Sequence, residues 1–266
     1  MKWLDALPKN HRRGSFPRCL LFMEGDRTIV SDKLTKLVGL PDIYVEPKDF
    51  WMPKGLPVLK ATGEWDVTPM EEAKLGESRG FLSNDQRKEV TSWWLAVPGG
   101  ANTPNWDIAS TCTIGEKHGL LLVEAKAHGA ELKEEGKSLD KGASAASIAN
   151  HEQIGRAIGA ASTELEQAIK GWKLSRDSHY QLANRFAWAW KLASMGVPVV
   201  LVYLGFICAT EVSDLGEPFI HCDDWSRVVL EHSRSIVPER AWDRSLKVGP
   251  NTINALIRVW KQDFLA

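Results

Sequence analysis

Long apolar runs are missing from this sequence of 266 residues. A membrane-spanning helix needs about 18 to 20 consecutive apolar residues. The longest apolar stretch, Val197 to Ile207, is interrupted by Pro198 and Gly205, so it predicts a buried strand. The N-terminus lacks the basic and then apolar order of a secretory signal. We therefore expect a cytoplasmic protein with no membrane partner.

Cysteine is also scarce. The four cysteines are widely spaced and form no C-x-x-C pair, which argues against a zinc ribbon. A cytoplasmic chain rarely keeps structural disulfides. We therefore expect buried, inert thiols at Cys19, Cys112, Cys208 and Cys222.

Neither sign of charge is in excess. The chain has 33 Lys and Arg against 34 Asp and Glu, which gives a net charge of −1. A polycation that adheres to any nucleic acid is excluded, so such contacts must come from a local basic face. The densest basic run, Lys9 to Arg18, includes Arg12 and Arg13 as candidates to contact phosphates. Such a run is more often a solvated loop.

Periodicity and turn residues predict an α/β order of elements. A helix is expected from about 85 to 96, with Ser83 or Asn84 as its N-cap. A hairpin and a later strand are expected within a mixed sheet that is flanked by helices. The expected strands cover 106–114, 120–127 and 197–207, and the other expected helices cover 149–172, 177–195, 224–234 and 250–264.

The domain organisation that we predict is one compact domain in three parts. Residues 1–80, rich in proline, glycine and charge, form an N-terminal extension packed on the core. Residues 81–210 form the core, with a helical insertion at about 129–178. Residues 211–266 form a C-terminal helical extension.

The second strand of the hairpin carries unusual polar residues. It reads Leu120-Leu-Leu-Val-Glu-Ala-Lys-Ala, and four apolar residues in a row predict a strand covered on both faces. Glu124 and Lys126 are two residues apart and therefore project to the same face. A carboxylate and an ammonium at the end of a buried strand are costly unless they are paired or bind something.

The first strand supplies Asp107. If Gly115 and Glu116 form a two-residue turn, Asp107 faces Glu124 with Cβ atoms about 5 Å apart. Two carboxylates that close repel each other, and a divalent cation is their natural counter-charge. If the turn instead takes all of Gly115 to Gly119, the two carboxylates fall on opposite faces unless a bulge restores the parity.

These residues resemble a known pattern. Asn105-Trp-Asp107 followed by Glu124-Ala-Lys126 is similar to the PD-(D/E)XK motif of restriction endonucleases and related repair and recombination nucleases. The proline of the motif is displaced to Pro104. The resemblance covers roughly residues 83 to 207. It implies a restriction-endonuclease-like core, a mixed central sheet flanked by helices, to which the two terminal parts are added.

The resemblance also implies an activity and a metal. We expect the protein to be a magnesium-dependent nuclease that hydrolyses phosphodiester bonds in nucleic acid, and among nucleases we prefer a DNA endonuclease. Manganese could replace magnesium. Asp107 and Glu124 would be metal ligands, with the backbone carbonyl of Ala125 as a third. Lys126 would position the attacking water. Some relatives hold an iron–sulfur cluster through clustered cysteines, which this chain lacks, so no such cluster is expected.

Flanking helices supply the remaining site residues that the family pattern implies. An acidic residue on the preceding helix often completes the site, and Glu89 matches it, with Asp85 as the fallback. On the following helix, Gln181 is expected to reach the site and Arg185 to contact nucleic acid, together with the bordering Asn184. Arg185 stands where exonuclease-like members show tyrosine, which disfavours that branch.

Alternatives stay open at this stage. The same fold can serve as a catalytically inactive nucleic-acid-binding or assembly module. The motif can also be a coincidence in an unrelated α/β interaction protein, with Asp107, Glu124 and Lys126 in an exposed ion pair. A homodimer is compatible with the nuclease hypothesis, because nucleases that cut both strands often pair.

Overall fold

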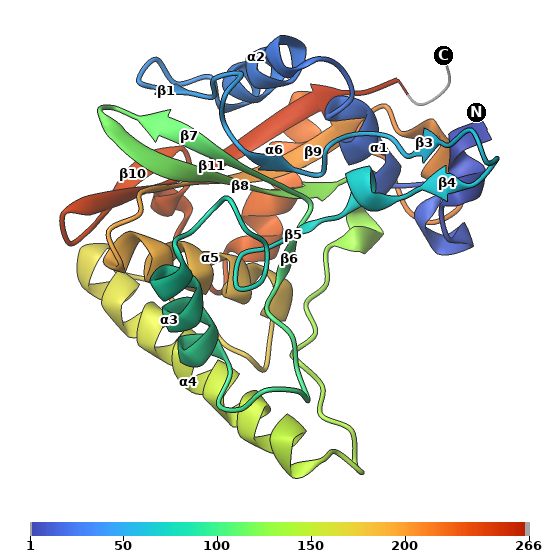
Figure 1. Cartoon of the computed structure of the whole chain (residues 1–266). Coiled ribbons are helices and arrows are strands. Elements are labelled where there is room, and N and C mark those ends of the chain that lie inside the picture. Colours follow the sequence, from blue (N-terminus) through green and yellow to red (C-terminus); the bar gives the residue numbers. More distant parts are fainter. Residues whose placement is uncertain (1, 264–266) are drawn as a thin grey trace.

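The central feature of the computed structural model, which describes residues 2–263, is a seven-stranded curled sheet (Figure 1). Its strand order is β1-β7-β8-β9-β11-β10, and β2 also pairs with β7. Strands β8, β9 and β11 run parallel, whereas the other pairs are antiparallel. The strands are β1 (Ile43–Tyr44), β2 (Trp51–Met52), β7 (Ile108–Ile114), β8 (Lys117–Lys126), β9 (Val199–Ile207), β10 (Arg244–Val248) and β11 (Asn251–Lys261).

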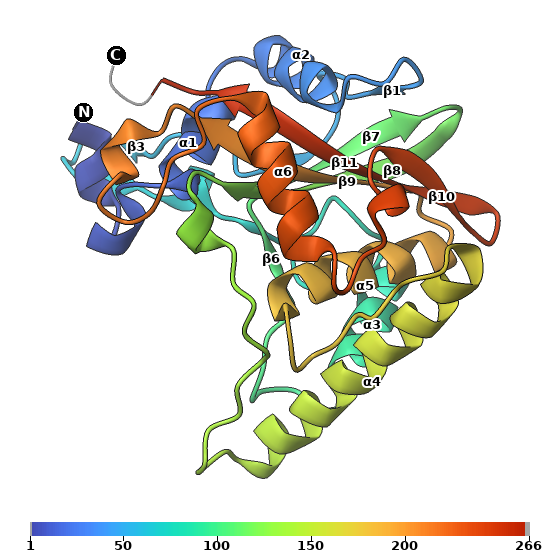
Figure 2. The same cartoon turned by 180° about the vertical axis from the view of Figure 1, so that it is seen from behind.

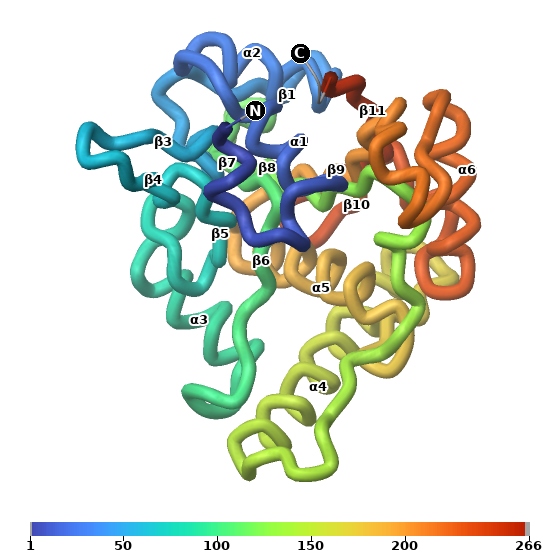
Figure 3. Tube along the Cα trace, turned by 90° about the vertical axis from the view of Figure 1, so that its right-hand side faces the viewer, coloured from blue at the N-terminus to red at the C-terminus, as the bar shows by residue number. Residues whose placement is uncertain are grey.

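Helices cover both faces of this sheet, so the molecule is a mixed α/β protein (Figures 1 and 2). One face packs against α1 (Ser15–Phe22) and α2 (Arg27–Val38). The other packs against α5 (Tyr180–Ser194) and α6 (Cys222–Ser233), with α3 (Asn84–Trp94) and α4 (Ala145–Ala168) behind α5. Figure 3 shows α2 and α4 at opposite ends of the molecule.

Short elements fill the connections. Two small antiparallel pairs lie outside the main sheet: β3 (Val58–Leu59) with β4 (Trp65–Asp66), and β5 (Ala73–Lys74) with β6 (Asn105–Trp106). The short 3₁₀ helices are η1 (Lys2–Ala6), η2 (Lys9–His11), η3 (Thr68–Met70), η4 (Gly129–Glu131), η5 (Thr210–Val212) and η6 (Glu239–Ala241).

The hairpin of β7 and β8 has the first of the two registers that the sequence left open. Ile114 pairs with Lys117, so Gly115 and Glu116 form a two-residue turn. Gly115 adopts φ 61°, a left-handed conformation that suits such turns. The ladder continues to Ile108 opposite Val123, and one further step along it places Asp107 beside Glu124.

Local signals located the helices that flank the hairpin. Ser83 caps α3 and forms a capping box with Gln86, which satisfies backbone N–H groups that the first turn leaves without partners. The expected helices at 149–172 and 177–195 correspond to α4 and α5, and the strand at 197–207 corresponds to β9. The helix expected near 224–234 corresponds to α6.

The C-terminal part differs from the prediction. A helix was expected over 250–264, but the structure has the strand β11 there, which pairs with both β9 and β10. The prediction is therefore wrong for residues 250–263, and residue 264 lies outside the described residues. Ile253, Leu256 and Ile257 are buried, and a strand covered on both faces shows no alternation that separates it from a buried helix. Residues 211–266 are therefore not simply a helical extension.

The N-terminal part also contributes to the main sheet. Strands β1 and β2 pair with β7, while α1 and α2 pack on the sheet face that contains Leu121 and Val123. No helix within residues 2–263 combines the length and the apolar character that crossing a bilayer requires.

The cysteines only partly match the prediction. All four are free; Cys19 and Cys112 are buried, but Cys208 and Cys222 are exposed, so the expectation of buried thiols is wrong for these two. Cys208 follows β9 in a surface turn, and Cys222 is the first residue of α6. Both lie where the chain leaves the core, a position that residue type alone does not indicate.

Candidate active site

Asp107 lies in the single-residue gap between β6 and β7. Its Oδ2 accepts a hydrogen bond of 2.6 Å from the backbone N–H of Ala125. This bond links the residue that precedes β7 to the β8 residue that follows Glu124. The half-buried carboxylate is therefore fixed by backbone structure as well as by strand register.

Glu124 is buried and has a cation on each oxygen. Its Oε1 accepts a hydrogen bond from the ammonium of Lys126, and its Oε2 accepts one of 2.6 Å from Nε of Arg185. Only 1% of the Glu124 side chain is exposed, against 6% for Lys126 and 7% for Arg185. The arrangement is a desolvated triad that connects β8 to α5, and an exposed surface ion pair is excluded.

Aromatic and amide groups hold Arg185 in place. Its Cζ lies 4.5 Å from the ring centroid of Trp106, a cation–π distance. One Nη donates a hydrogen bond of 3.1 Å to the side-chain oxygen of Asn184. Three kinds of contact therefore keep this guanidinium beside Glu124.

Glu72 is a third acidic residue at the site, and sequence reasoning missed it. It directly precedes β5, whose pairing with β6 brings it to Asn105, and its Oε2 accepts a hydrogen bond of 3.0 Å from Nδ2 of that residue. Its charge acts on both Asp107 and Glu124. No motif in the proline- and glycine-rich N-terminal part marks Glu72; only the β5–β6 pairing identifies it.

Burial and neighbouring charges set the ionisation of these groups. Burial, followed by the repulsion of Glu124 and Glu72, raises the pKa of Asp107 to about 8. Burial also opposes ionisation of Glu124, but Arg185 and Lys126 outweigh it and hold its pKa below the ordinary value. For Lys126, burial is outweighed by the attraction of Glu124 and Asp107, so its pKa is raised.

A cavity of about 510 Å³ opens beside Arg185. The start of α5 and the segment before α4 form two of its walls. The predicted residues on α5 therefore meet at one cavity, which also carries two lysines. Its polar lining includes Lys133, Lys137, Gln181, Asn184 and Arg185.

Other predicted residues are not brought to this site. Glu89 is exposed on α3, and its carboxylate pairs with Nζ of Lys191 at 2.7 Å. Asp85 is exposed in the first turn of the same helix. Ser83, one of the two N-caps that the sequence suggested, begins α3, but the helix packs against α4, and Glu89 contacts Lys191 of α5. Glu72, and not Glu89, is the further acidic residue whose charge acts on Asp107.

The two predicted basic contacts are engaged within the chain. Nε of Arg12 donates a hydrogen bond of 3.0 Å to the carbonyl of Leu7. Nη1 of Arg13 forms an ion pair of 2.9 Å with Asp214. Both guanidinium groups hold the N-terminal segment in place, and neither lines the cavity beside Arg185.

Comparison with known proteins adds nothing to these contacts. No family model, no curated protein and no solved structure matches the chain. The interpretation of the site therefore depends on its own residues and geometry.

Proposed function

We propose that the protein is a magnesium-dependent nuclease that hydrolyses phosphodiester bonds in nucleic acid, with endonucleolytic cleavage of DNA preferred, on a restriction-endonuclease-like core. The observation that carries this proposal is the convergence of Asp107, Glu124 and Lys126 at the end of the β7–β8 hairpin. The groups that the motif requires lie together in a desolvated site, where electrostatic effects are strong.

The donor set fits a hard divalent cation. Asp107, Glu124 and Glu72 bring three carboxylates, against the two cations of Lys126 and Arg185. Magnesium prefers oxygen ligands, which these carboxylates and the carbonyl of Ala125 supply. Both oxygens of Glu124 are engaged, but each carboxylate oxygen retains a further lone-pair position. Asp107 and Glu124 would hold the ion, with Glu72 beside them.

Each residue has a distinct role in the proposed reaction. A bound magnesium ion supplies polarisation of the phosphate and acidification of water. The Lys126 ammonium, fixed by Glu124, orients the attacking water and offsets negative charge that develops on the phosphate. Asn184 and Trp106 hold Arg185 so that its charge faces the same region.

The substrate class follows from the cavity beside Arg185. Lys133 and Lys137, together with Arg185, outnumber the one acidic residue of its wall, Glu135, although the whole chain is nearly neutral. Phosphate groups are the natural partners of lysine and arginine side chains. The adjoining amide side chains of Gln181 and Asn184 can donate hydrogen bonds to phosphate or base edges.

One observation favours a second candidate function, nucleic-acid binding without catalysis. Arg185 takes the second oxygen of Glu124, so two cations already outweigh the charge of this carboxylate. A buried carboxylate paired in this way has less need of a metal ion. The fold would then bind phosphates at the cavity but would lack the ion that hydrolysis requires.

The test is a cleavage assay on plasmid, linear duplex and single-stranded DNA with magnesium, manganese or a chelator. We expect nicking of plasmid in magnesium or manganese and none in the chelator. Replacing Lys126 with methionine, which keeps most of the side-chain volume, should abolish cleavage while circular dichroism shows a retained fold.

Each other outcome decides between the two functions. DNA binding in magnesium and manganese without cleavage by the native chain would replace the nuclease proposal with the non-catalytic one. Neither cleavage nor binding would overturn both. Equal cleavage by the Lys126→Met variant would assign any activity to another site or to a contaminant.

A further inference from the structure

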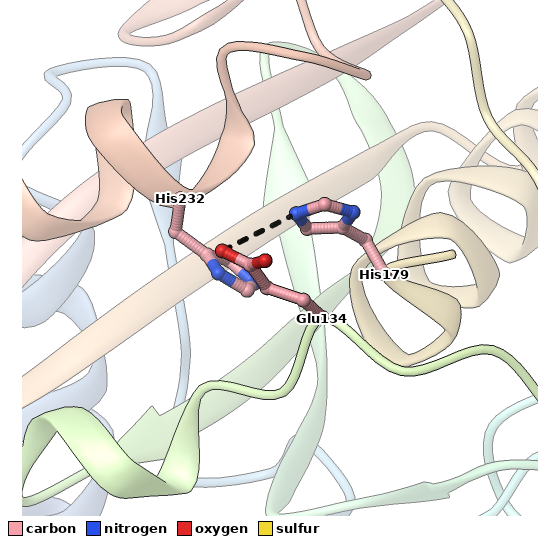
Figure 4. A group of neighbouring side chains, drawn as sticks. All are labelled: Glu134, His179 and His232. Atoms are coloured by element: carbon pink, nitrogen blue, oxygen red, sulfur yellow. Dashed lines mark ion pairs between the residues drawn. The ribbon is translucent and has the colours of Figure 1, made fainter.

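A second group of metal-type side chains lies apart from the carboxylates of the proposed active site. Glu134, His179 and His232 each offer one ligand atom, and these atoms all lie within 4.8 Å of one another. Within residues 2–263 this is the sole set of three or more histidine, cysteine or acidic residues that meets this distance. Figure 4 shows the Glu134 carboxylate and the two imidazole rings turned toward one region.

Backbone structure holds two of the three residues together. The backbone N–H of His179 donates a hydrogen bond of 2.7 Å to the carbonyl of Glu134, and the next residue, Glu135, bridges to Ser178. His179 adopts φ 47°, a left-handed conformation that is uncommon for a residue other than glycine. The chain therefore keeps the His179 side chain beside Glu134 at a conformational cost.

His232 reaches the group from a third segment, the last turn of α6. Its ring centroid lies 4.8 Å from that of His179, with the planes tilted by 57°. The carboxyl-terminal end of a helix carries partial negative charge, which favours a cation nearby. Three separate parts of the fold thus converge on one point.

The two rings make only long polar contacts in the described part of the chain. Neither ring forms a hydrogen bond there, and Nδ1 of His179 is buried. The Glu134 oxygen is 4.0 Å from Nε2 of His179, which is too long for a hydrogen bond. The buried Nδ1 of His179 lies on the far side of its ring, whereas the atoms that face one another stay too far apart for a hydrogen bond and leave room for a further group between them.

We propose that Glu134, His179 and His232 bind one zinc ion, with a fourth coordination position open to water. Two imidazoles and one carboxylate are a donor set typical of zinc, whereas magnesium prefers oxygen ligands alone. Zinc bonds of about 2.0 to 2.2 Å require donor atoms about 3.3 Å apart, so the side chains need to move inward by only a small amount. Glu134 is exposed, which leaves that side of the ion accessible to solvent.

The charges around the group are compatible with a divalent cation. Glu134 brings one negative charge to the group, and each imidazole offers one ring nitrogen that can bind a cation. The ammonium of Lys126 opposes a cation here, while the Glu134 carboxylate favours it. The zinc site is thus a neighbour of the proposed active site with a different donor set.

An ion at this position would join the segment before α4 to α5 and α6. Glu134 follows Lys133 and precedes Lys137, which both line the cavity beside Arg185. Zinc would therefore fix the wall of that cavity and stabilise the folded chain by mass action.

Calorimetric titration of the full chain with zinc tests the proposal. Cys208 and Cys222 are first replaced by serine, because exposed thiols bind zinc independently. We expect one site per chain. The His232→Ala variant should bind more than about 100-fold more weakly, since loss of an outer-shell partner alone costs roughly 10- to 100-fold. The His118→Ala variant, which alters an exposed histidine near the start of β8, should bind as the parent does.

Further variants make the result decisive. Glu134→Gln changes an exposed residue, so the fold is retained, and its zinc affinity should also fall. Asp107→Asn should leave zinc binding unchanged, which separates this site from the proposed magnesium site. Cobalt added in place of zinc should give the visible spectrum of a tetrahedral site without thiolate bands. No zinc binding by the parent, or equal binding by the Glu134→Gln and His232→Ala variants, would overturn the proposal.

Discussion

Asp107 is the least compensated charge of the proposed active site. Its Oδ2 is bound to a backbone N–H, while the two nearby cations, Lys126 and Arg185, are both committed to Glu124. Glu72 adds a third negative charge. The residue that carries the proposed metal chemistry is therefore also a source of electrostatic instability when no cation is bound.

The pH dependence of the free energy of unfolding should reveal the uncompensated charge of Asp107. In the unfolded chain the Asp107 carboxyl loses its proton near 3.8, but in the folded chain it keeps it up to a pKa of about 8. Between these values the folded state binds more protons, so this group makes stability fall as pH rises. The Asp107→Asn variant removes this contribution. Urea unfolding in chelator at pH 5 and at pH 8 should therefore show a smaller loss of stability in the variant than in the parent. Parallel losses would contradict the assigned environment of Asp107.

Glu72 gives a prediction about activity. The Glu72→Gln variant keeps an oxygen that can accept the hydrogen bond from Asn105 but loses the charge beside Asp107. We expect magnesium-dependent cleavage to fall by roughly 10- to 100-fold, the range typical of residues that support a metal site. Glu89→Gln is the matched control, because Glu89 pairs with Lys191 away from the site and its replacement should leave the rate unchanged. A loss of cleavage in the Glu89→Gln variant, with an unchanged rate in the Glu72→Gln variant, would instead assign Glu89 to the site.

At the scale of elements, one ion pair joins α5 to β8. Arg185 and Glu124 are both nearly inaccessible to solvent, so each depends on the other to compensate its buried charge. The pair therefore stabilises the packing of α5 on the sheet at this point.

Replacing Arg185 with methionine should lower the free energy of unfolding by about 3–5 kcal/mol, because a buried carboxylate loses a partner. The comparison is Lys191→Ala, which removes the half-exposed pair with Glu89 and should cost at most about 1 kcal/mol. Urea unfolding at neutral pH measures both. Equal, small effects would show that Arg185 is not the buried partner of Glu124.

A second contact between elements depends on a glycine. A Cβ built on Gly205 in β9 would lie less than 3.0 Å from three atoms of the Trp225 indole on α6. The indole N–H donates a hydrogen bond of 3.0 Å to the carbonyl of Tyr203, so the ring cannot easily move aside. The absence of a side chain at Gly205 is what lets α6 approach the sheet.

The Gly205→Ala variant should therefore be destabilised by about 1–3 kcal/mol, the usual cost of overpacking a core. Gly159→Ala is the control, because a Cβ there meets no atom within 4 Å and the residue lies within α4. That change should stabilise the protein by about 0.5–1 kcal/mol, since alanine loses less conformational freedom than glycine in a helix. Thermal unfolding of the two variants should move in opposite directions.

The elements also show what the sequence could predict. The sequence reduced the β7–β8 register to two alternatives, and the two-residue turn at Gly115 and Glu116 selects the one whose ladder runs to Ile108, next to Asp107. Ser83 likewise fixed the start of α3. These features are local, and local chemistry determines them. The strand β11 could not be separated from a helix, because burial on both faces removes the alternation that distinguishes the two.

Contacts between residues far apart in the sequence could not be predicted from local patterns. Glu72 reaches Asp107 only because β5 pairs with β6 across about thirty residues of chain. The pairing of Arg185 with Glu124 depends on how α5 packs on the sheet, which residue type and spacing do not show; the nucleic-acid contact expected of this arginine stays a prediction. Glu89 failed for the same reason, since its helix was located correctly but its orientation was not.

At the scale of the whole molecule, distant parts of the chain build one sheet, and the proposed site lies at the carboxyl end of its strand β8. The N-terminal strands β1 and β2 extend it beyond β7, and the C-terminal β11 fills the place beside β9. Glu124 and Lys126 lie at the carboxyl end of β8, next to the parallel strand β9. Ligands commonly bind outside the carboxyl ends of such strands, which agrees with the cavity beside Arg185.

The central claim is that Asp107 and Glu124 share one divalent cation, and a crystal structure with manganese tests it most directly. Anomalous scattering should show one ion bonded to both carboxylates at about 2.0 to 2.3 Å, with Lys126 or Arg185 shifted on Glu124 to admit it. Crystals of the Asp107→Asn variant should lack that peak. No ion at this position in the parent crystals, with Glu124 still paired to both cations, would contradict the account.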